Sequence, residues 1–100
     1  MNPSEISNET RLRVDALFPT DLRNEVLNIL ATKCGNNLPG LGALGAVELE
    51  RFQFAALKQS RGTIEGLQKA IELANLDWRD LLMGAGFGHD LNAHEAWFPK

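Results

Sequence analysis

Four polar residues near the end of the chain have side chains that could bind a metal ion or transfer a proton. They are His89, Asp90, His94 and Glu95. On a helix, Asp90 and His94 would share a face, which is an acceptable spacing for two zinc ligands. A structural zinc site needs four ligands, however, and the single cysteine, Cys34, lies far away in the sequence. Asp90 also stands where a helix N-cap is expected, so surface or capping roles are favoured for this group. We expect no metal and no cofactor.

Two glycine clusters could bind an anion through backbone N–H groups. The first, Gly40-Leu41-Gly42-Ala43-Leu44-Gly45, has the spacing of a dinucleotide-binding fingerprint. That fingerprint works only between a strand and a helix, and no strand is predicted here. The second cluster, Gly84-Ala85-Gly86-Phe87-Gly88, has no Lys or Arg close to it in the sequence. We interpret both clusters as loops, with Gly86 ending a helix in a Schellman motif. No set of catalytic residues can be assigned.

The composition indicates one soluble domain. The chain has 100 residues, 44% of them hydrophobic and 23% charged, with a formal net charge of −3. This charge argues against general affinity for nucleic acid or for anionic membranes. No apolar run is long enough to span a bilayer, and a single cysteine requires no oxidising compartment. We therefore expect a cytoplasmic protein with frayed residues 1–8 and one helical domain over 9–100.

Helix start and stop signals divide the chain into short helices. Ser7 or Asn8 caps a first helix that ends at Phe18-Pro19, and Thr20 caps a second that Gly35 ends. A third helix is expected from near residue 44 to 60 and a fourth after a cap at Thr63. A fifth follows a cap at residue 77, and a last turn ends near residue 97. No segment alternates apolar and polar residues with period two. The predicted fold is all-α, a compact bundle of four or five helices with a short C-terminal helical turn.

The third predicted helix is apolar on nearly all sides. Val47 and Phe54 project to one side, and Leu49 and Phe52 to another. Such a helix is normally buried from several directions. One interpretation is a central helix surrounded by the others, and the alternative is a homodimer with Phe52 or Phe54 in the seam. The four residues are therefore the candidate interface.

The C-terminus carries two aromatic residues, Trp97 and Phe98. Aromatic side chains have large apolar surfaces, and a chain terminus does not normally leave two of them exposed to water. We predict that the pair docks on the bundle, near Trp78.

Residues 67–87 also give the outline of a helix-turn-helix. The helix that would enter the DNA groove, Trp78-Arg79-Asp80-Leu81-Leu82-Met83, offers one basic residue and one acid. A groove-binding helix is normally better supplied with cations, so two packed helices explain the outline more simply.

Parts of the sequence are similar to a group of short bacterial proteins of unknown function. The similarity is carried by the run from Asp77 to Phe87, by His94-Glu95-Ala96-Trp97, by residues 52–58 and by residues 34–39. It implies a stand-alone bacterial protein, and no activity, cofactor or catalytic residue.

Three functions follow as hypotheses. The favoured one is a small interaction or regulatory protein that binds a protein partner or itself. The alternatives are a ligand-binding protein or enzyme with a site near Gly84–Glu95, and a helix-turn-helix DNA binder. Enzymatic activity is the less favoured interpretation, because no residue set for catalysis was found.

Overall fold

The computed structural model describes residues 6–33, 46–87 and 93–99. Every regular element in these ranges is a helix, and the predicted all-α bundle with a short C-terminal helical turn is therefore confirmed. None of these helices is both long and apolar enough to cross a bilayer. In chain order the elements are α1 (Asn8–Leu17), α2 (Thr20–Lys33), α3 (Ala46–Ser60), α4 (Ile64–Leu76), α5 (Trp78–Gly84) and a 3-10 helix, η1 (Ala93–Ala96).

Local signals fix the ends of α1. Ser7 is the N-cap, and its Oγ accepts a hydrogen bond from the Thr10 backbone N–H. The helix ends at Phe18, whose backbone is extended because Pro19 follows it. Before this helix, Ser7 is hydrogen-bonded and Ile6 packs against the core.

Single residues also separate α4 from its neighbours. After α3 the backbone has a positive φ at two successive residues, 54° at Arg61 and 80° at Gly62. The N-cap of α4 is Thr63, whose Oγ1 accepts from the Gly66 N–H. Asp77 ends α4 and caps α5, where its Oδ1 accepts from the Arg79 N–H at 3.0 Å.

The C-terminus of α5 forms the predicted Schellman motif. Gly86 has a φ of 81°, and its N–H donates to the Met83 carbonyl at 3.0 Å. The Phe87 N–H donates to the Leu82 carbonyl at 2.8 Å. Both bonds satisfy carbonyls that the helix end leaves free, and Phe87 enters the core.

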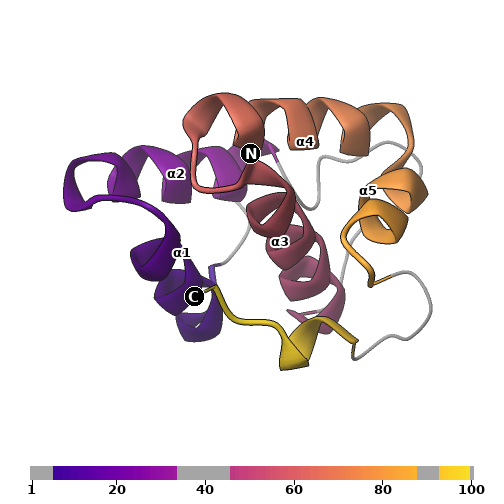
Figure 1. Ribbon diagram of the computed structural model, residues 1–100, viewed down its shortest axis with the longest axis horizontal. Helices are drawn as coiled ribbons and strands as arrows, with labels where there is room; N and C mark the ends of the chain where they lie inside the picture. The colour runs from indigo at the N-terminus through magenta and orange to yellow at the C-terminus, as the bar shows by residue number, and fades with distance from the viewer. Residues whose placement is uncertain (1–5, 34–45, 88–92, 100) are drawn as a thin grey trace.

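Helix α3 lies in the middle of the bundle (Figure 1), where it contacts α1, α4, α5 and η1. Its residues 52–57 are all buried, which explains why the helix is apolar on nearly all sides. Phe52 is 3% and Phe54 0% exposed, so neither offers surface to a second chain in this conformation. The side chains of Val47 and Leu49 lie outside the described part. A homodimer stays a prediction.

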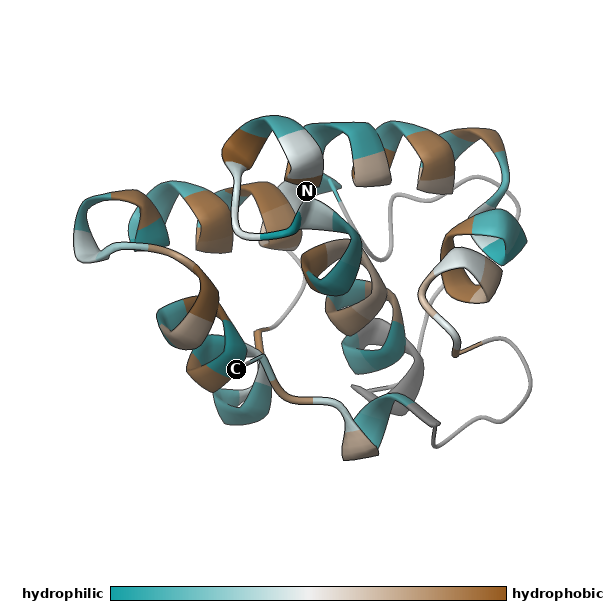
Figure 2. Cartoon of the chain, in the orientation of Figure 1, coloured by the Kyte–Doolittle hydropathy of each residue, from teal (hydrophilic) through white to brown (hydrophobic). Residues whose placement is uncertain are grey.

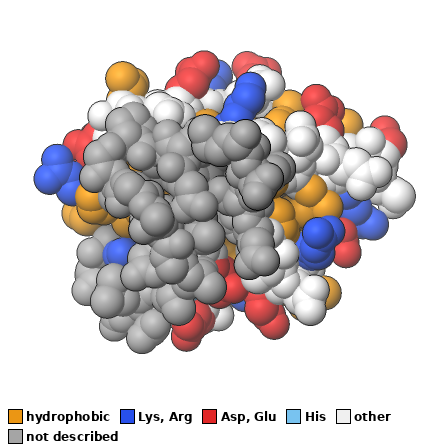
Figure 3. All heavy atoms as spheres, turned by 180° about the vertical axis from the view of Figure 1, so that it is seen from behind, with side chains coloured by type: hydrophobic (Ala, Val, Ile, Leu, Met, Phe, Trp, Pro, Cys, Tyr) orange, Lys and Arg blue, Asp and Glu red, His pale blue; other side chains and the backbone are white. Residues whose placement is uncertain are grey.

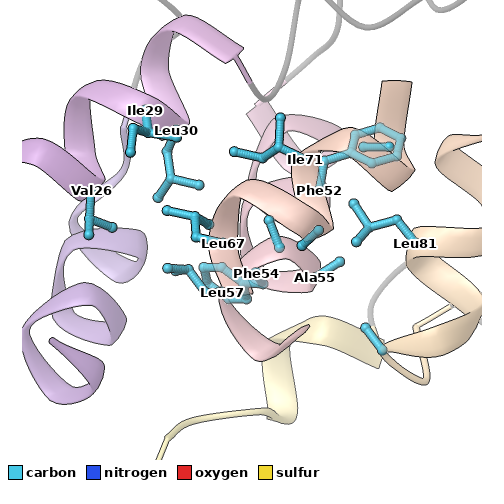
Figure 4. Packing of buried hydrophobic residues seen from close by; sticks show 14 of the residues in the cluster. Val26, Ile29, Leu30, Phe52, Phe54, Ala55, Leu57, Leu67, Ile71 and Leu81 are labelled. Carbon is cyan, nitrogen blue, oxygen red and sulfur yellow. The ribbon is translucent and has the colours of Figure 1, made fainter. Parts of the chain in front are cut away.

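Aliphatic and aromatic side chains from five helices meet around α3. Figure 4 shows Leu30 of α2 pointing toward Leu67 of α4, and Val26 and Ile29 belong to the same buried cluster. Brown and teal residues alternate along α2 and α4 (Figure 2), as expected of helices with one buried face. Each fully buried Val, Leu, Ile or Phe contributes roughly 1.5–3 kcal/mol to folding, so this cluster dominates stability.

Candidate functional site

Two features of the described structure could serve a function: a set of aromatic rings under the C-terminal segment, and a groove between α2 and α4. The C-terminal segment is residues 93–99, which run along the bottom of the bundle to α1 in Figure 1.

The aromatic rings come from α3, from the end of α5 and from the C-terminal segment. The His94 ring meets Phe54 edge-on at 5.2 Å and Phe87 at 6.3 Å between centroids. Trp97 lies 6.1 Å from Phe54 and 6.3 Å from Phe87. The side chains of His94 and Trp97 therefore contact the same two phenylalanines. We call Phe54, Phe87, His94 and Trp97 the aromatic box.

Arg13 of α1 joins the box to the N-terminal helix. It is only 5% exposed, and its guanidinium carbon lies 4.0 Å from the centre of the Phe54 ring. Its Nε donates to the Trp97 carbonyl at 3.0 Å, and Nη1 donates to the Glu9 carbonyl and carboxylate. The guanidinium also lies 4.9 Å from the Phe98 ring. One buried cation thus holds the C-terminal segment against α1.

Glu50 of α3 lies between Ser7, the N-cap of α1, and His94 of the box. Its Oε2 accepts a hydrogen bond from Ser7 Oγ at 2.9 Å, and its Oε1 lies 3.5 Å from His94 Nε2. His94 is fully buried, and neither ring nitrogen has a hydrogen-bond partner among the described residues. A buried imidazole without such bonds costs stability, so the fit of His94 is incomplete.

The polar groups around the box do not form a catalytic arrangement in the described part of the chain. Ser7 Oγ donates to the Glu50 carboxylate and accepts from the Thr10 N–H as the N-cap of α1, so the hydroxyl has a structural role in this arrangement. His94 and Glu50 could supply two metal ligands, but no group of three His, Cys, Asp or Glu gathers among the described residues. What these groups do in the structure is position the C-terminal segment.

The structure separates the polar residues that the sequence put forward as a site. His94 is buried, so the interpretation of His94 as a surface residue is wrong. It packs against Phe54, which is far away in the sequence, and against Phe87, which comes shortly before it in the chain. Glu95, the next residue, is exposed. His89 and Asp90 lie outside the described residues.

The other sequence motifs have separate outcomes. Cys34 and the Gly40–Gly45 fingerprint lie outside the described part of the chain. The predicted docking of the C-terminal pair holds for Trp97, which packs on Phe54 and Phe87, whereas Phe98 is 48% exposed. Trp78 instead meets Phe52 edge-on at 5.7 Å, so the two tryptophans have different partners.

Cations from α3, which are distant in sequence, bind the second glycine cluster. Lys58 Nζ donates to the Ala85 carbonyl at 2.8 Å, and Arg51 Nη2 donates to the Phe87 carbonyl at 2.7 Å. Positive groups are favoured at a helix C-terminus, where carbonyls carry partial negative charge. The backbone N–H groups of Gly86 and Phe87 are used in the Schellman motif. The cluster is thus a stabilised helix end.

The second feature is a half-open groove between α2 and α4 with a volume of about 780 Å³. Its apolar residues are Ile29, Ile71 and Leu76, and Leu76 is 85% exposed. Ile29 and Ile71 are only 8% and 5% exposed, so Leu76 is the described residue through which this lining presents apolar surface to solvent. The other described residues of the lining are polar or charged: Lys33, Gln68, Glu72 and Asn75.

The helix-turn-helix alternative finds little support in the described residues. Helix α5 has seven residues, and Arg79 is engaged with the Asp77 carboxylate at 3.2 Å. On the described part of the face in Figure 3, basic and acidic side chains are mixed. A DNA-binding surface normally gathers basic residues on one face.

Comparison of the chain with known protein families, with curated proteins and with solved structures finds no match. The resemblance to short bacterial proteins therefore stays a prediction, and function has to be argued from the site.

Proposed function

We propose that this protein is a small interaction protein of the bacterial cytoplasm that binds an amphipathic helical segment of a partner in the α2/α4 groove. The observation that carries the proposal is the 85% exposure of Leu76 beside Ile29 and Ile71. Apolar side chains spaced along one face of a helix are the usual anchors in grooves of this kind.

The charges on the groove define the partner further. Lys33 lies at the end of α2 and Glu72 lies on α4, so the two rims carry opposite charges. A partner helix would therefore need an apolar stripe, an acidic residue near Lys33 and a basic residue near Glu72. Such complementary charges set orientation and specificity more than affinity.

A synthetic peptide tests the proposal directly. The probe is a 14-residue amphipathic helix with leucines in one stripe, a glutamate near one end and a lysine near the other. Its addition should shift the backbone NMR signals of Ile71 and Leu76 and leave those of α5 unchanged.

Two variants with the same added charge make the test specific. Leu76→Glu should weaken binding at least tenfold, because it places a carboxylate at the apolar anchor. Met83→Glu is the matched control, since Met83 is 69% exposed on α5 and away from the groove lining. Equal weakening by both variants, or no shifts with millimolar peptide, would contradict the proposal.

Small-ligand binding is the second candidate, because 780 Å³ falls within the range of about 300–1,000 Å³ typical of ligand pockets. Shifts at the groove caused by metabolite-sized molecules, without any response to the peptide, would favour this alternative.

A further inference from the structure

The way in which the C-terminal segment is attached resembles a bound peptide more than an integral helix of the bundle. Its one helical turn, η1, has four residues, and among the elements it makes extensive contact only with α3. Two side chains three residues apart, His94 and Trp97, enter the bundle and meet Phe54 and Phe87. Anchors at i and i+3 on one face are typical of a short helix in a groove.

The receptor side of this contact has the chemistry of an interface core. It offers two phenylalanine rings, the buried guanidinium of Arg13 and the carboxylate of Glu50. Aromatic residues and arginine carry most of the energy in protein interfaces. Arg13 also binds the backbone of the C-terminal segment, because its Nε donates to the Trp97 carbonyl.

The segment fits this receptor incompletely. Both His94 ring nitrogens are buried without a hydrogen bond to any described residue, and Phe98 is 48% exposed. Segments held by few and imperfect contacts open at lower free energy than the core of the same protein. The C-terminal segment should therefore separate from Phe54 and Phe87 far more often than the whole chain unfolds.

We propose that the receptor formed by Phe54, Phe87, Arg13 and Glu50 is a peptide-binding site, filled here by the chain's own residues 93–99 and able to take the same segment from a second copy. The cost of such an exchange is low, because the incoming residues make the contacts that the outgoing ones lose. This site is separate from the α2/α4 groove, so either proposal can fail without the other.

The full chain with a weakened segment and a peptide added in trans tests the proposal. The chain variant is His94→Ala with Trp97→Ala, and the probe is a synthetic peptide of residues 93–100. One millimolar peptide should raise the melting temperature of the variant by several degrees and leave the wild type unchanged. A control peptide with alanine in place of both anchors should do nothing. A folded variant that does not respond to the peptide would overturn the proposal.

Hydrogen exchange of the wild type covers the case in which the variant does not fold. The Trp97 N–H, which donates to the His94 carbonyl, should exchange at least tenfold faster than the core amides of α3 and α4. Equal rates would show that the segment opens only when the whole chain unfolds, and this too would overturn the proposal.

Discussion

Replacement of Arg13 by methionine removes the buried cation while keeping a flexible apolar side chain of similar reach. The variant loses the bond to the Trp97 carbonyl and the contacts with the Glu9 carbonyl and carboxylate. It also loses the positive charge 4.0 Å from the centre of the Phe54 ring. Of these contacts, the bond to the Trp97 carbonyl joins α1 to the C-terminal segment.

The expected loss follows from opposing terms. A hydrogen bond to a charged group contributes about 1.5–3 kcal/mol, and a partly desolvated cation–π contact contributes about 0.5–2 kcal/mol. Against this stands the cost of burying a guanidinium, which methionine does not incur. We expect a net loss of about 2–3 kcal/mol, because the Trp97 carbonyl is left without its donor. For a domain of this size that corresponds to a fall in melting temperature of roughly 10–20 °C.

Urea and thermal unfolding followed by circular dichroism measure this loss. Glu9→Gln is the matched control, because the Glu9 side chain is 60% exposed and an exposed ion pair contributes only about 0–1 kcal/mol. Arg13→Lys should lose most of the same stability, since an ammonium group lacks the planar fork of donors. A loss below about 0.5 kcal/mol for Arg13→Met would refute the reasoning, because repacking by methionine would then replace the cation fully.

Two further predictions concern single residues. Gly66→Ala should destabilise the fold by about 1–3 kcal/mol, although alanine normally favours a helix, because the new methyl group would overlap the Ser60 carbonyl oxygen. Gly84→Ala, where the methyl would meet only the end of a flexible side chain, should be nearly neutral in the same denaturant titration. The hydrogen bond from the Arg79 side chain lowers the pKa of Asp77 below its ordinary value of 3.8. Because the folded-state pKa is the lower one, the carboxylate stabilises the fold above about pH 4 and this contribution is lost as the pH falls further. Asp77→Ala should therefore lower the melting temperature at pH 7 and make a smaller difference at pH 2.5, and an equal difference at both would contradict this.

The helix boundaries could be predicted because their causes are local. Pro19 forces the residue before it out of the helical region, and Asp77 can cap a helix with its own side chain. Gly86 adopts the left-handed conformation that a Schellman motif needs. Each of these effects depends on residues within one or two turns, so the sequence pattern contains it.

The environment of the C-terminal residues could not be predicted, because it depends on distant parts of the chain. The bond between Arg13 and Trp97 joins residues 84 positions apart. In α1 an arginine looks like an ordinary surface residue, and nothing local marks it as buried. The burial of His94 has a similar cause, since Phe54 of α3 packs against it only after the chain folds. The apolar residues on nearly all sides of α3 indicate a central helix. They do not indicate which residues form the α2/α4 groove.

Site-specific photo-crosslinking in native cells tests the proposed function most directly. A benzoylphenylalanine replaces Leu76 in one version of the chain and Met83 in another, and both versions are irradiated under the same conditions. The account predicts a discrete adduct, larger than the 11.0 kDa chain, from position 76 and none from position 83. No adduct from position 76, or the same adducts from both positions, would contradict the claim that the α2/α4 groove is the binding surface.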